Sequence, residues 1–272
     1  MNGIIITTTA PLQLRPSRCC ELADEALFGW TVQVLEAPCA GWYKVRTHYG
    51  YEGYVPAESL SMGDGNAQRW AELKKMVVLR GSCTVLAAPD VQSWPLCALT
   101  RGALVAIAGS PNEDGWMKVT LPDGSEGYTK VGFLGAYYEK PSSDDEEILR
   151  KNICGSAFMY MGAHYRWGGK SPLGLDCSGL TFMAYFLNGV IIYRDAHIKE
   201  GYPLHQIAKE DMKPADLIFF PGHVAMYLGN GKYIHSTAKN GSDGVVINSL
   251  NPEDADYRSD LPEKITAVGS IF

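Results

Sequence analysis

Cys177 lies in the stretch GLDCSGL, between an aspartate and a serine and directly before an apolar run. The apolar residues after it recur at the spacing of one helix face: Leu180, Met183, Ala184 and Leu187. The sulfur would then lie in the first helical turn, with Asp176 as the N-cap. Free backbone N–H groups and the helix dipole should stabilise a thiolate there and lower the cysteine pKa from about 8.5. Such a cysteine is either a buried structural residue or a nucleophile, and a nucleophile needs a base.

Two histidines downstream could supply the base. Both lie in PGHVAMYLGNGKYIHSTA, where two strand-like runs are joined by Gly-Asn-Gly, a strong hairpin signal. The register decides whether the histidines share a face. A two-residue turn would put His223 on the opposite face from His235. A three-residue loop, 229 to 231, would instead pair Ala225 with His235 and make the two histidines diagonal neighbours, roughly 7–8 Å apart. We therefore predict the three-residue loop.

These residues indicate nucleophilic catalysis. His223 would accept the thiol proton of Cys177 and later protonate the leaving amine, while His235 would bind the far ring nitrogen and fix the tautomer. A zinc site made of the same three residues is the alternative, but no fourth ligand has a suitable spacing. The remaining histidines have no such context and are expected on the surface or in packing: His48, His164, His197 and His205.

The composition is that of a soluble globular protein, with 46% hydrophobic and 20% charged residues. A formal net charge of -6 disfavours nucleic acids, anionic membranes and wall polymers as partners. No apolar run is long enough for a membrane span, and the start MNGIIITTTAPLQLRPS lacks the features of a secretory signal. Seven cysteines without regular spacing do not form a recognisable disulfide framework. We expect a cytoplasmic protein with reduced thiols, no metal and no cofactor.

An internal repeat organises the first half of the chain. GWYKVRTHYGYEGYV, which begins at Gly41, returns as GWMKVTLPDGSEGYT, which begins at Gly115. In each copy valine, tyrosine and threonine alternate with polar residues and stop at glycine-bearing turns, which is typical of short antiparallel strands. Each copy should therefore form a small all-β unit.

These repeats resemble bacterial Src-homology-3-like (SH3-like) barrels, small modules often attached to cell-wall enzymes. The resemblance predicts a first barrel over 1–62 and a second over 76–138. Helix formers in GDGNAQRWAELKKM predict a helical linker over 63–75. The stretch EKPSSDDEEILRKNI places acids at the start of a helix, so a third domain should occupy 139–272.

Three stretches of that third domain carry a further resemblance: HYRWGGKSPLGLDCSGL, PADLIFFPGHVAMYLGNGKYIHS and GVVINSL. They look like the NlpC-type family of papain-like cell-wall peptidases. The resemblance implies an α+β domain with an antiparallel sheet and the nucleophile at a helix N-terminus. It also implies hydrolysis of the γ-D-glutamyl bond to a diamino acid in peptidoglycan stem peptides through an acyl-enzyme. Cys177 would be the nucleophile, His223 the base and His235 the third member.

The same resemblance implies further residues that face the substrate: Tyr165, Trp167, Asp176, Ser178, Arg194 and Asp195. The Tyr165 hydroxyl would lie near the developing oxyanion, beside the backbone N–H of Cys177. A purely structural aromatic under the glycine turn is the alternative for Tyr165. The match at Arg194 is incomplete, because Tyr193 stands where the family has proline and the glutamine expected after the segment is missing.

Family members with N-terminal barrels use a glutamate and a tyrosine of the first barrel, which closes one end of the cleft, to recognise a free L-alanine amine. CELADEALFG offers Glu21, with Glu25 as a second candidate, and GYEGY offers Tyr51, which the second repeat replaces by Ser125. A buried carboxylate facing an ammonium group would explain a requirement for a free N-terminus. The alternative is that Glu21 is only a solvated acid.

Together these observations predict a cytoplasmic cysteine peptidase that cuts the bond between γ-D-glutamate and meso-diaminopimelate or L-lysine. Its partners would be small peptidoglycan-derived peptides with a free N-terminal L-alanine, as in murein recycling. Two alternatives stay open. One is an amidase or acyltransferase with the same thiol chemistry, and the other is a non-catalytic wall-binding protein.

Overall fold

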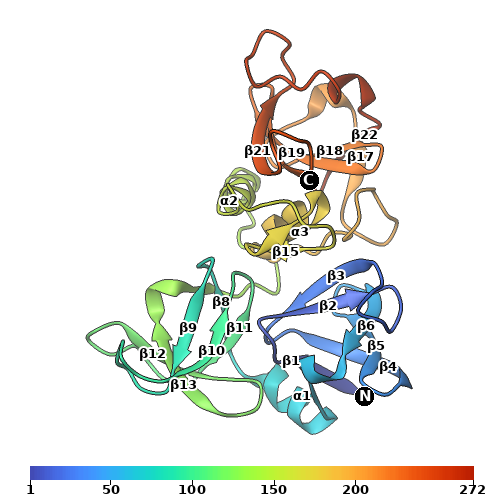
Figure 1. The fold of residues 1–272 in the computed structure, drawn as a ribbon. Coiled ribbons are helices and arrows are strands. Elements are labelled where there is room, and N and C mark those ends of the chain that lie inside the picture. The colour runs from blue at the N-terminus through green and yellow to red at the C-terminus, as the bar shows by residue number, and fades with distance from the viewer. The chain divides into compact units, whose positions relative to one another are not determined.

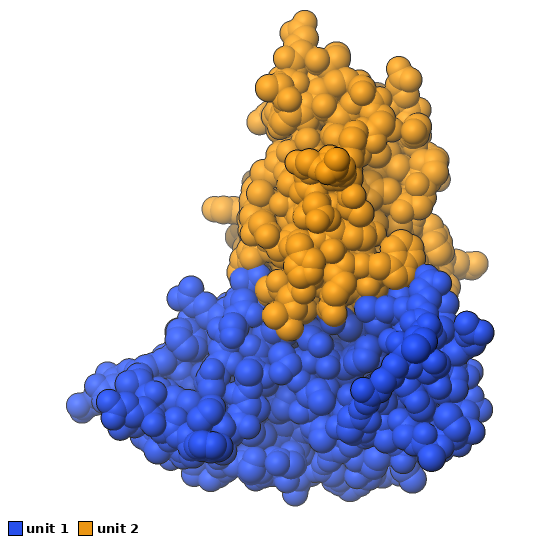
Figure 2. Space-filling model, in the orientation of Figure 1, with its two compact units in different colours: residues 1–137 blue, residues 138–272 orange.

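The computed structural model describes residues 1–272, and the chain forms two compact units, Met1–Tyr137 and Tyr138–Phe272. Figure 2 gives each unit its own colour. The first unit contains both sequence repeats, and the second contains Cys177 and the two histidines. None of the helices combines the length and apolar character needed to cross a bilayer. All seven cysteines are free thiols.

The first repeat belongs to a seven-stranded antiparallel sheet with the order β3-β2-β6-β5-β4-β1-β7. Its strands are β1 (Asn2–Ile5), β2 (Thr9–Gln13), β3 (Leu22–Leu27), β4 (Thr31–Cys39), β5 (Trp42–Thr47), β6 (Glu52–Pro56) and β7 (Leu60–Met62). Lys44 of β5 lies opposite Tyr54 of β6. The repeated stretch is therefore an antiparallel hairpin, as its alternating pattern predicts.

The second repeat builds a sheet of the same topology, β10-β9-β13-β12-β11-β8-β14. Its strands are β8 (Lys75–Val78), β9 (Cys83–Leu86), β10 (Pro95–Leu99), β11 (Leu104–Ile107), β12 (Trp116–Thr120), β13 (Glu126–Lys130) and β14 (Leu134–Ala136). Lys118 and Tyr128 pair here as Lys44 and Tyr54 do in the first sheet. The prediction of two all-β barrels is confirmed (Figure 1).

Hydrogen bonds and apolar packing connect the two barrels within the first unit. Phe28 packs in the core of the second barrel, and its carbonyl accepts a hydrogen bond from the Leu104 amide at 2.9 Å. The Trp30 indole donates to the Gly102 carbonyl at 2.9 Å. Gly29 has a φ of +79°, and a Cβ there would lie 2.4 Å from the Leu104 carbonyl oxygen. Only glycine allows this close approach.

Helix α1 (Asp64–Glu72) connects the barrels inside the predicted linker. The side chain of Trp70 is 1% exposed, and its indole N–H donates to the Gly29 carbonyl at 2.8 Å. The buried Trp70 ring, with its N–H hydrogen-bonded, therefore holds the linker helix against the first barrel.

The second unit is an α+β domain built on a six-stranded antiparallel sheet with the order β17-β22-β18-β19-β20-β21 (Figure 1). Its strands are β17 (His205–Ile207), β18 (Leu217–Phe220), β19 (His223–Gly229), β20 (Lys232–Thr237), β21 (Gly244–Ser249) and β22 (Ala267–Ser270). Helix α3 (Cys177–Phe186) packs on β19 and β20, and α2 (Glu146–Phe158) packs on α3. The predicted fold class is confirmed.

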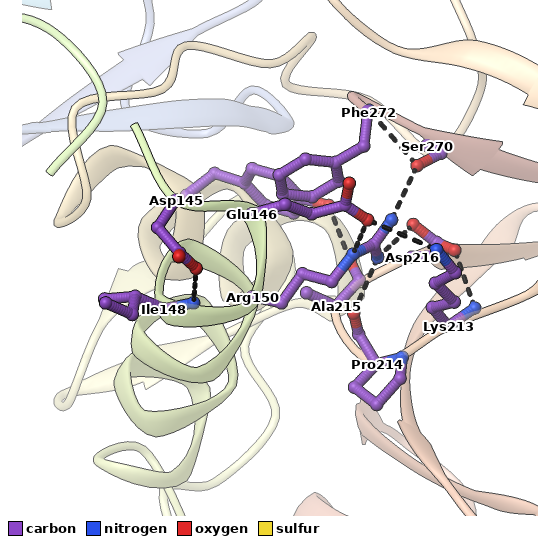
Figure 3. A network of polar contacts seen from close by, with 11 residues as sticks. Asp145, Glu146, Ile148, Arg150, Lys213, Pro214, Ala215, Asp216, Ser270 and Phe272 are labelled. Atoms are coloured by element: carbon purple, nitrogen blue, oxygen red, sulfur yellow. Dashed lines mark hydrogen bonds and ion pairs between the residues drawn. The ribbon is translucent and has the colours of Figure 1, made fainter. Parts of the chain in front are cut away.

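A buried polar network joins α2 to the sheet (Figure 3). Asp145 caps α2 by accepting from the Ile148 amide at 3.0 Å. Arg150, one turn further, donates to the Asp216 carboxylate at 2.7 Å. The Phe272 ring covers the guanidinium at 3.9 Å. Because the Asp216 side chain is fully buried, removing either charge would leave the other unpaired, so this contact specifies how α2 docks.

Candidate active site

Cys177 is the first residue of α3, as the periodicity predicts. Asp176 is the N-cap, and its Oδ1 accepts from the Gly179 amide at 2.6 Å. The cysteine is 5% exposed. Its sulfur accepts hydrogen bonds from the backbone N–H groups of Val224 and Ser178. Because Val224 directly follows His223, the sulfur lies against the start of β19.

The predicted lowering of the Cys177 pKa is wrong. Burial, together with the negative charge of Asp176, raises the pKa of this thiol to about 11. The N–H groups of Val224 and Ser178 and the charge of Arg194 act in the opposite direction but do not offset burial. Cys177 is therefore a neutral thiol in the free protein, and a base must remove its proton when it reacts.

The hairpin that carries the histidines differs from the prediction at its turn. The loop is the two-residue turn Asn230–Gly231, with φ values of +50° and +72°. The ladder shifts between Tyr227 and Gly229, so that Leu228 is one extra residue on β19. This bulge restores the register that the predicted three-residue loop required, and Tyr227 pairs with Tyr233. The predicted loop is wrong, but the register beyond it is right.

The structure brings His223 and His235 together. His223 Nε2 lies 2.7 Å from His235 Nδ1, and the ring centroids are 5.0 Å apart. Burial lowers the pKa of His223 to about 3 and that of His235 to about 4. Both rings are therefore neutral near pH 7. The site combines a neutral thiol with a hydrogen-bonded pair of neutral imidazoles.

Asn248 extends this chain of contacts and was not predicted. Its Oδ1 lies 2.9 Å from His235 Nε2, and its Nδ2 donates to the Asp256 carbonyl at 2.7 Å. The signal was present in GVVINSL. Val246 pairs with His235 across β20 and β21, so Asn248, two residues later, shares its face.

The zinc alternative does not fit this geometry. Both ring nitrogens of His235 already take part in hydrogen bonds, one with His223 and one with Asn248. No group of three or more His, Cys, Asp or Glu side chains in residues 1–272 is arranged to hold a metal ion. Zinc binding by His235 would require one of these two hydrogen bonds to be broken.

Asp176, Ser178 and Arg194 bind one another at the start of α3. Arg194, which is 1% exposed, donates to the two Asp176 oxygens at 3.0 and 3.1 Å and to Ser178 Oγ at 2.7 Å. Ser178 Oγ in turn donates to Asp176 Oδ1 at 3.2 Å. Gly168 N–H donates to Asp176 Oδ2 at 2.8 Å. These contacts stabilise the start of α3, and the predicted substrate-binding role of the three residues stays a prediction.

The other predicted residues of this unit lie around the same helix end. Tyr165 forms a parallel bridge with Leu175, two residues before Cys177. Burial raises its pKa, and the nearby Cys177 raises it further, so the phenol stays protonated. Trp167 is 58% exposed. Asp195 is half-buried and hydrogen-bonds the Tyr193 hydroxyl. Tyr165 is thus a predicted residue whose pKa is affected by the neighbouring Cys177.

The amine-recognition residues lie in the first unit. Glu21 is exposed and Tyr51 is half-buried. Glu25 on β3 is only 1% exposed, and its neighbour Asp24 is fully buried with the Tyr49 hydroxyl as a donor. Glu25 and Asp24 therefore carry buried carboxylates and Glu21 an exposed one, and the predicted role of Glu21 and Tyr51 in amine recognition stays a prediction. The four remaining histidines are exposed, as predicted: His48, His164, His197 and His205.

Comparisons with known proteins agree with this architecture. The NlpC/P60 family model matches residues 162–258, and the model of the bacterial dipeptidyl-peptidase Sh3 domain matches residues 14–60. Dipeptidyl-peptidase 6 of Lysinibacillus sphaericus is 40% identical over 100% of both chains. A γ-D-glutamyl-L-lysine dipeptidyl-peptidase of Bacillus cereus is 27% identical over 79% of this chain and 67% of its own.

A solved structure shows the same fold. The crystal structure of an NlpC/P60 family protein from Bacillus cereus superposes with a TM-score of 0.81, at 21% identity over 98% of each chain. Full-length similarity to a named relative, a matching family model and a cysteine at a helix N-terminus beside paired histidines lead to one assignment. The chain belongs to the NlpC/P60 family of cysteine peptidases.

Proposed function

We propose that this peptidase cleaves the bond between γ-D-glutamate and a diamino acid, and so releases L-alanyl-γ-D-glutamate from peptidoglycan-derived peptides. The names of two relatives support this, because a dipeptidyl-peptidase removes two residues from an N-terminus and one relative is named for the γ-D-glutamyl-L-lysine bond. The observation that carries the chemistry is the 2.7 Å contact between His223 and His235, beside the strand start that Cys177 touches.

In the proposed reaction the Cys177 sulfur attacks the γ-glutamyl carbonyl carbon while His223 accepts the thiol proton. The tetrahedral intermediate collapses when the C–N bond breaks and His223 passes that proton to the leaving amine. Water, deprotonated by His223, then hydrolyses the thioester and regenerates the thiol. Near pH 7 His223 is unprotonated, so its ring has a lone pair for the thiol proton.

Two hydrogen-bond donors are proposed for the oxyanion of the intermediate. One is the backbone N–H of Cys177, at the start of α3, and the other is the Tyr165 hydroxyl. The raised pKa of Tyr165 supports its part, because a phenol must keep its proton to donate.

The preferred substrates are proposed to be small soluble peptides with a free N-terminal L-alanine, processed in the cytoplasm during murein recycling. The net charge of -6 supports this choice over intact wall, since anionic wall polymers would be repelled. The dipeptidyl-peptidase names support the free N-terminus.

Defined peptides test the proposal directly. L-Ala-γ-D-Glu-L-Lys and its meso-diaminopimelate analogue, each with a free and an N-acetylated terminus, are incubated with the full chain and analysed by mass spectrometry. We expect L-Ala-γ-D-Glu from the free peptides, little product from the acetylated ones, and none with Cys177→Ala, which should stay folded. Release of ammonia would indicate an amidase, transfer to an added amine an acyltransferase, and peptidoglycan binding without turnover a non-catalytic protein.

A further inference from the structure

We propose that Asn248 is a positioning residue that sets the tautomers of both histidines, so that Nδ1 of His223 is the atom that accepts the Cys177 proton. The inference rests on the proposed function for its catalytic meaning. The tautomers themselves are a property of the protein without substrate and can be measured separately.

The first step is the orientation of the Asn248 amide. Its Nδ2 donates to the Asp256 carbonyl at 2.7 Å. An amide nitrogen only donates and a carbonyl oxygen only accepts, so the two ends of the side chain cannot be exchanged. Asn248 Oδ1 therefore faces His235 Nε2 at 2.9 Å, and that nitrogen must carry the hydrogen.

The second step follows from the single N–H of a neutral imidazole. With the hydrogen on Nε2, His235 Nδ1 has a free lone pair and accepts from His223 Nε2, 2.7 Å away. The hydrogen of His223 is thereby placed on Nε2, and its Nδ1 is left unprotonated. Burial, which lowers the pKa of both rings, keeps each at one hydrogen near pH 7.

The Asp256 carbonyl that begins this chain is itself held in place. Lys232 Nζ donates to the carboxylates of Asp254 and Asp256, at 2.7 Å each. The Ser249 amide donates to the same Asp256 carbonyl at 3.1 Å. An acceptor fixed by two elements can orient Asn248 without being displaced by water.

Other groups packed around the histidines do not compete for these nitrogens. Tyr233 on β20 is fully buried with its ring 5.1 Å from that of His235, and its hydroxyl makes no hydrogen bond. On the segment after β21, Arg258 binds Asp260 through two contacts of 2.8 Å. Arg258 lowers the pKa of His223 and Asp260 raises it, so the two charges of this ion pair have opposite effects on the pKa of that histidine.

Nitrogen-15 NMR of histidine-labelled full chain tests the proposal, because protonated and unprotonated ring nitrogens resonate separately. In the wild type we expect His223 and His235 both to carry hydrogen on Nε2. Asn248→Leu should mix the tautomers of both rings and lower kcat roughly 10–100-fold with little change in KM. Asn248→Asp restores an acceptor, so it should restore the tautomers. Its negative charge should also move the acid limb of the pH profile to higher pH.

Asn240→Leu is the matched control, since Asn240 is an exposed asparagine of the same unit and takes part in none of the contacts described above. It should leave both tautomers unchanged. A hydrogen on Nδ1 of His223 in the wild type would overturn the proposal even if the Asn248 variants failed to fold. Unchanged tautomers in a folded Asn248→Leu protein would overturn it too. If the tautomers are as expected but no γ-D-glutamyl peptide is cut, the proposed function fails and this inference stands.

Discussion

Acidification should destabilise the second unit through His223 and His235. Burial lowers the pKa of His223 to about 3 and that of His235 to about 4, whereas an unfolded histidine titrates near about 6.5. Between these values the unfolded chain binds protons that the folded unit does not, so the free energy of unfolding falls with the pH. The contribution is complete above a pH of about 6.5 and is lost progressively as the pH falls towards the folded pKa values.

The size of the effect follows from the same pKa values. Between pH 7 and pH 5 each histidine should reduce the free energy of unfolding by roughly 2 kcal/mol, and both together by roughly 4 kcal/mol if they act independently. A unit of this size has a urea dependence of about 2 kcal/mol per molar. The urea midpoint of the second unit should therefore fall by roughly 2 M.

Pulsed labelling with a thiosulfonate, read by peptide mass spectrometry, measures this unit separately. Cys154 is 9% exposed on α2 and becomes reactive when the second unit unfolds. Cys83 is 3% exposed on β9 and reports on the second barrel in the same sample. His235→Gln should lose about half as much stability on acidification as the wild type. His205→Gln, at an exposed position, should lose as much as the wild type.

Two results would refute this reasoning. One is a Cys154 midpoint that moves by less than about 0.5 M between the two pH values, a change below about 1 kcal/mol. The other is an equal shift in the wild type and in His235→Gln. Either would mean that the rings are solvated or charged in the folded unit, and that the neutral pair described above is wrong.

Two further substitutions test the residues around the helix start. Arg194→Met leaves the Asp176 carboxylate buried without its cation, so it should cost roughly 3–5 kcal/mol in thermal or urea unfolding. Lys213→Met breaks the ion pair with Glu146, whose side chains are 63% and 43% exposed, and should cost less than about 1 kcal/mol. Equal losses in the two variants would contradict the stabilisation of buried Asp176 by Arg194. Tyr165→Phe should lower kcat about 100-fold with KM nearly unchanged, and an unaltered kcat in steady-state assays would show that the hydroxyl does not reach the oxyanion.

The large features of the fold could be predicted because they repeat or follow a period. The two copies of Gly-Trp-x-Lys-Val built two sheets of one topology, and the apolar spacing after Cys177 placed it at the start of α3. The Asp176 cap followed from residue type alone. Each of these depends on residues near one another in sequence, so local pattern was sufficient.

Errors arose where a distant contact or burial decided the result. The turn at Asn230–Gly231 has the local signature of a two-residue turn, and the bulge at Leu228 that corrects the register leaves no mark in the alternation. The contact between Arg194 and Asp176 could not be predicted either, because only the fold brings the two residues together. The pKa of Cys177 was misjudged because a helix N-terminus lowers it locally, whereas the burial that raises it comes from β19 and the rest of the unit.

The charge arrangement at the start of α3 explains why a buried thiol next to a carboxylate suits this chemistry. Asp176 is needed as a cap, but its charge opposes ionisation of Cys177. Arg194 neutralises that charge with two hydrogen bonds, so the cap is kept and the thiolate is not made prohibitively unstable. In the proposed mechanism the thiol stays neutral until His223 takes its proton in the transition state. On that proposal, the reactivity of Cys177 depends on the orientation of the histidine pair, and the contact of Asn248 with His235 matters as much to the chemistry as the helix dipole was expected to.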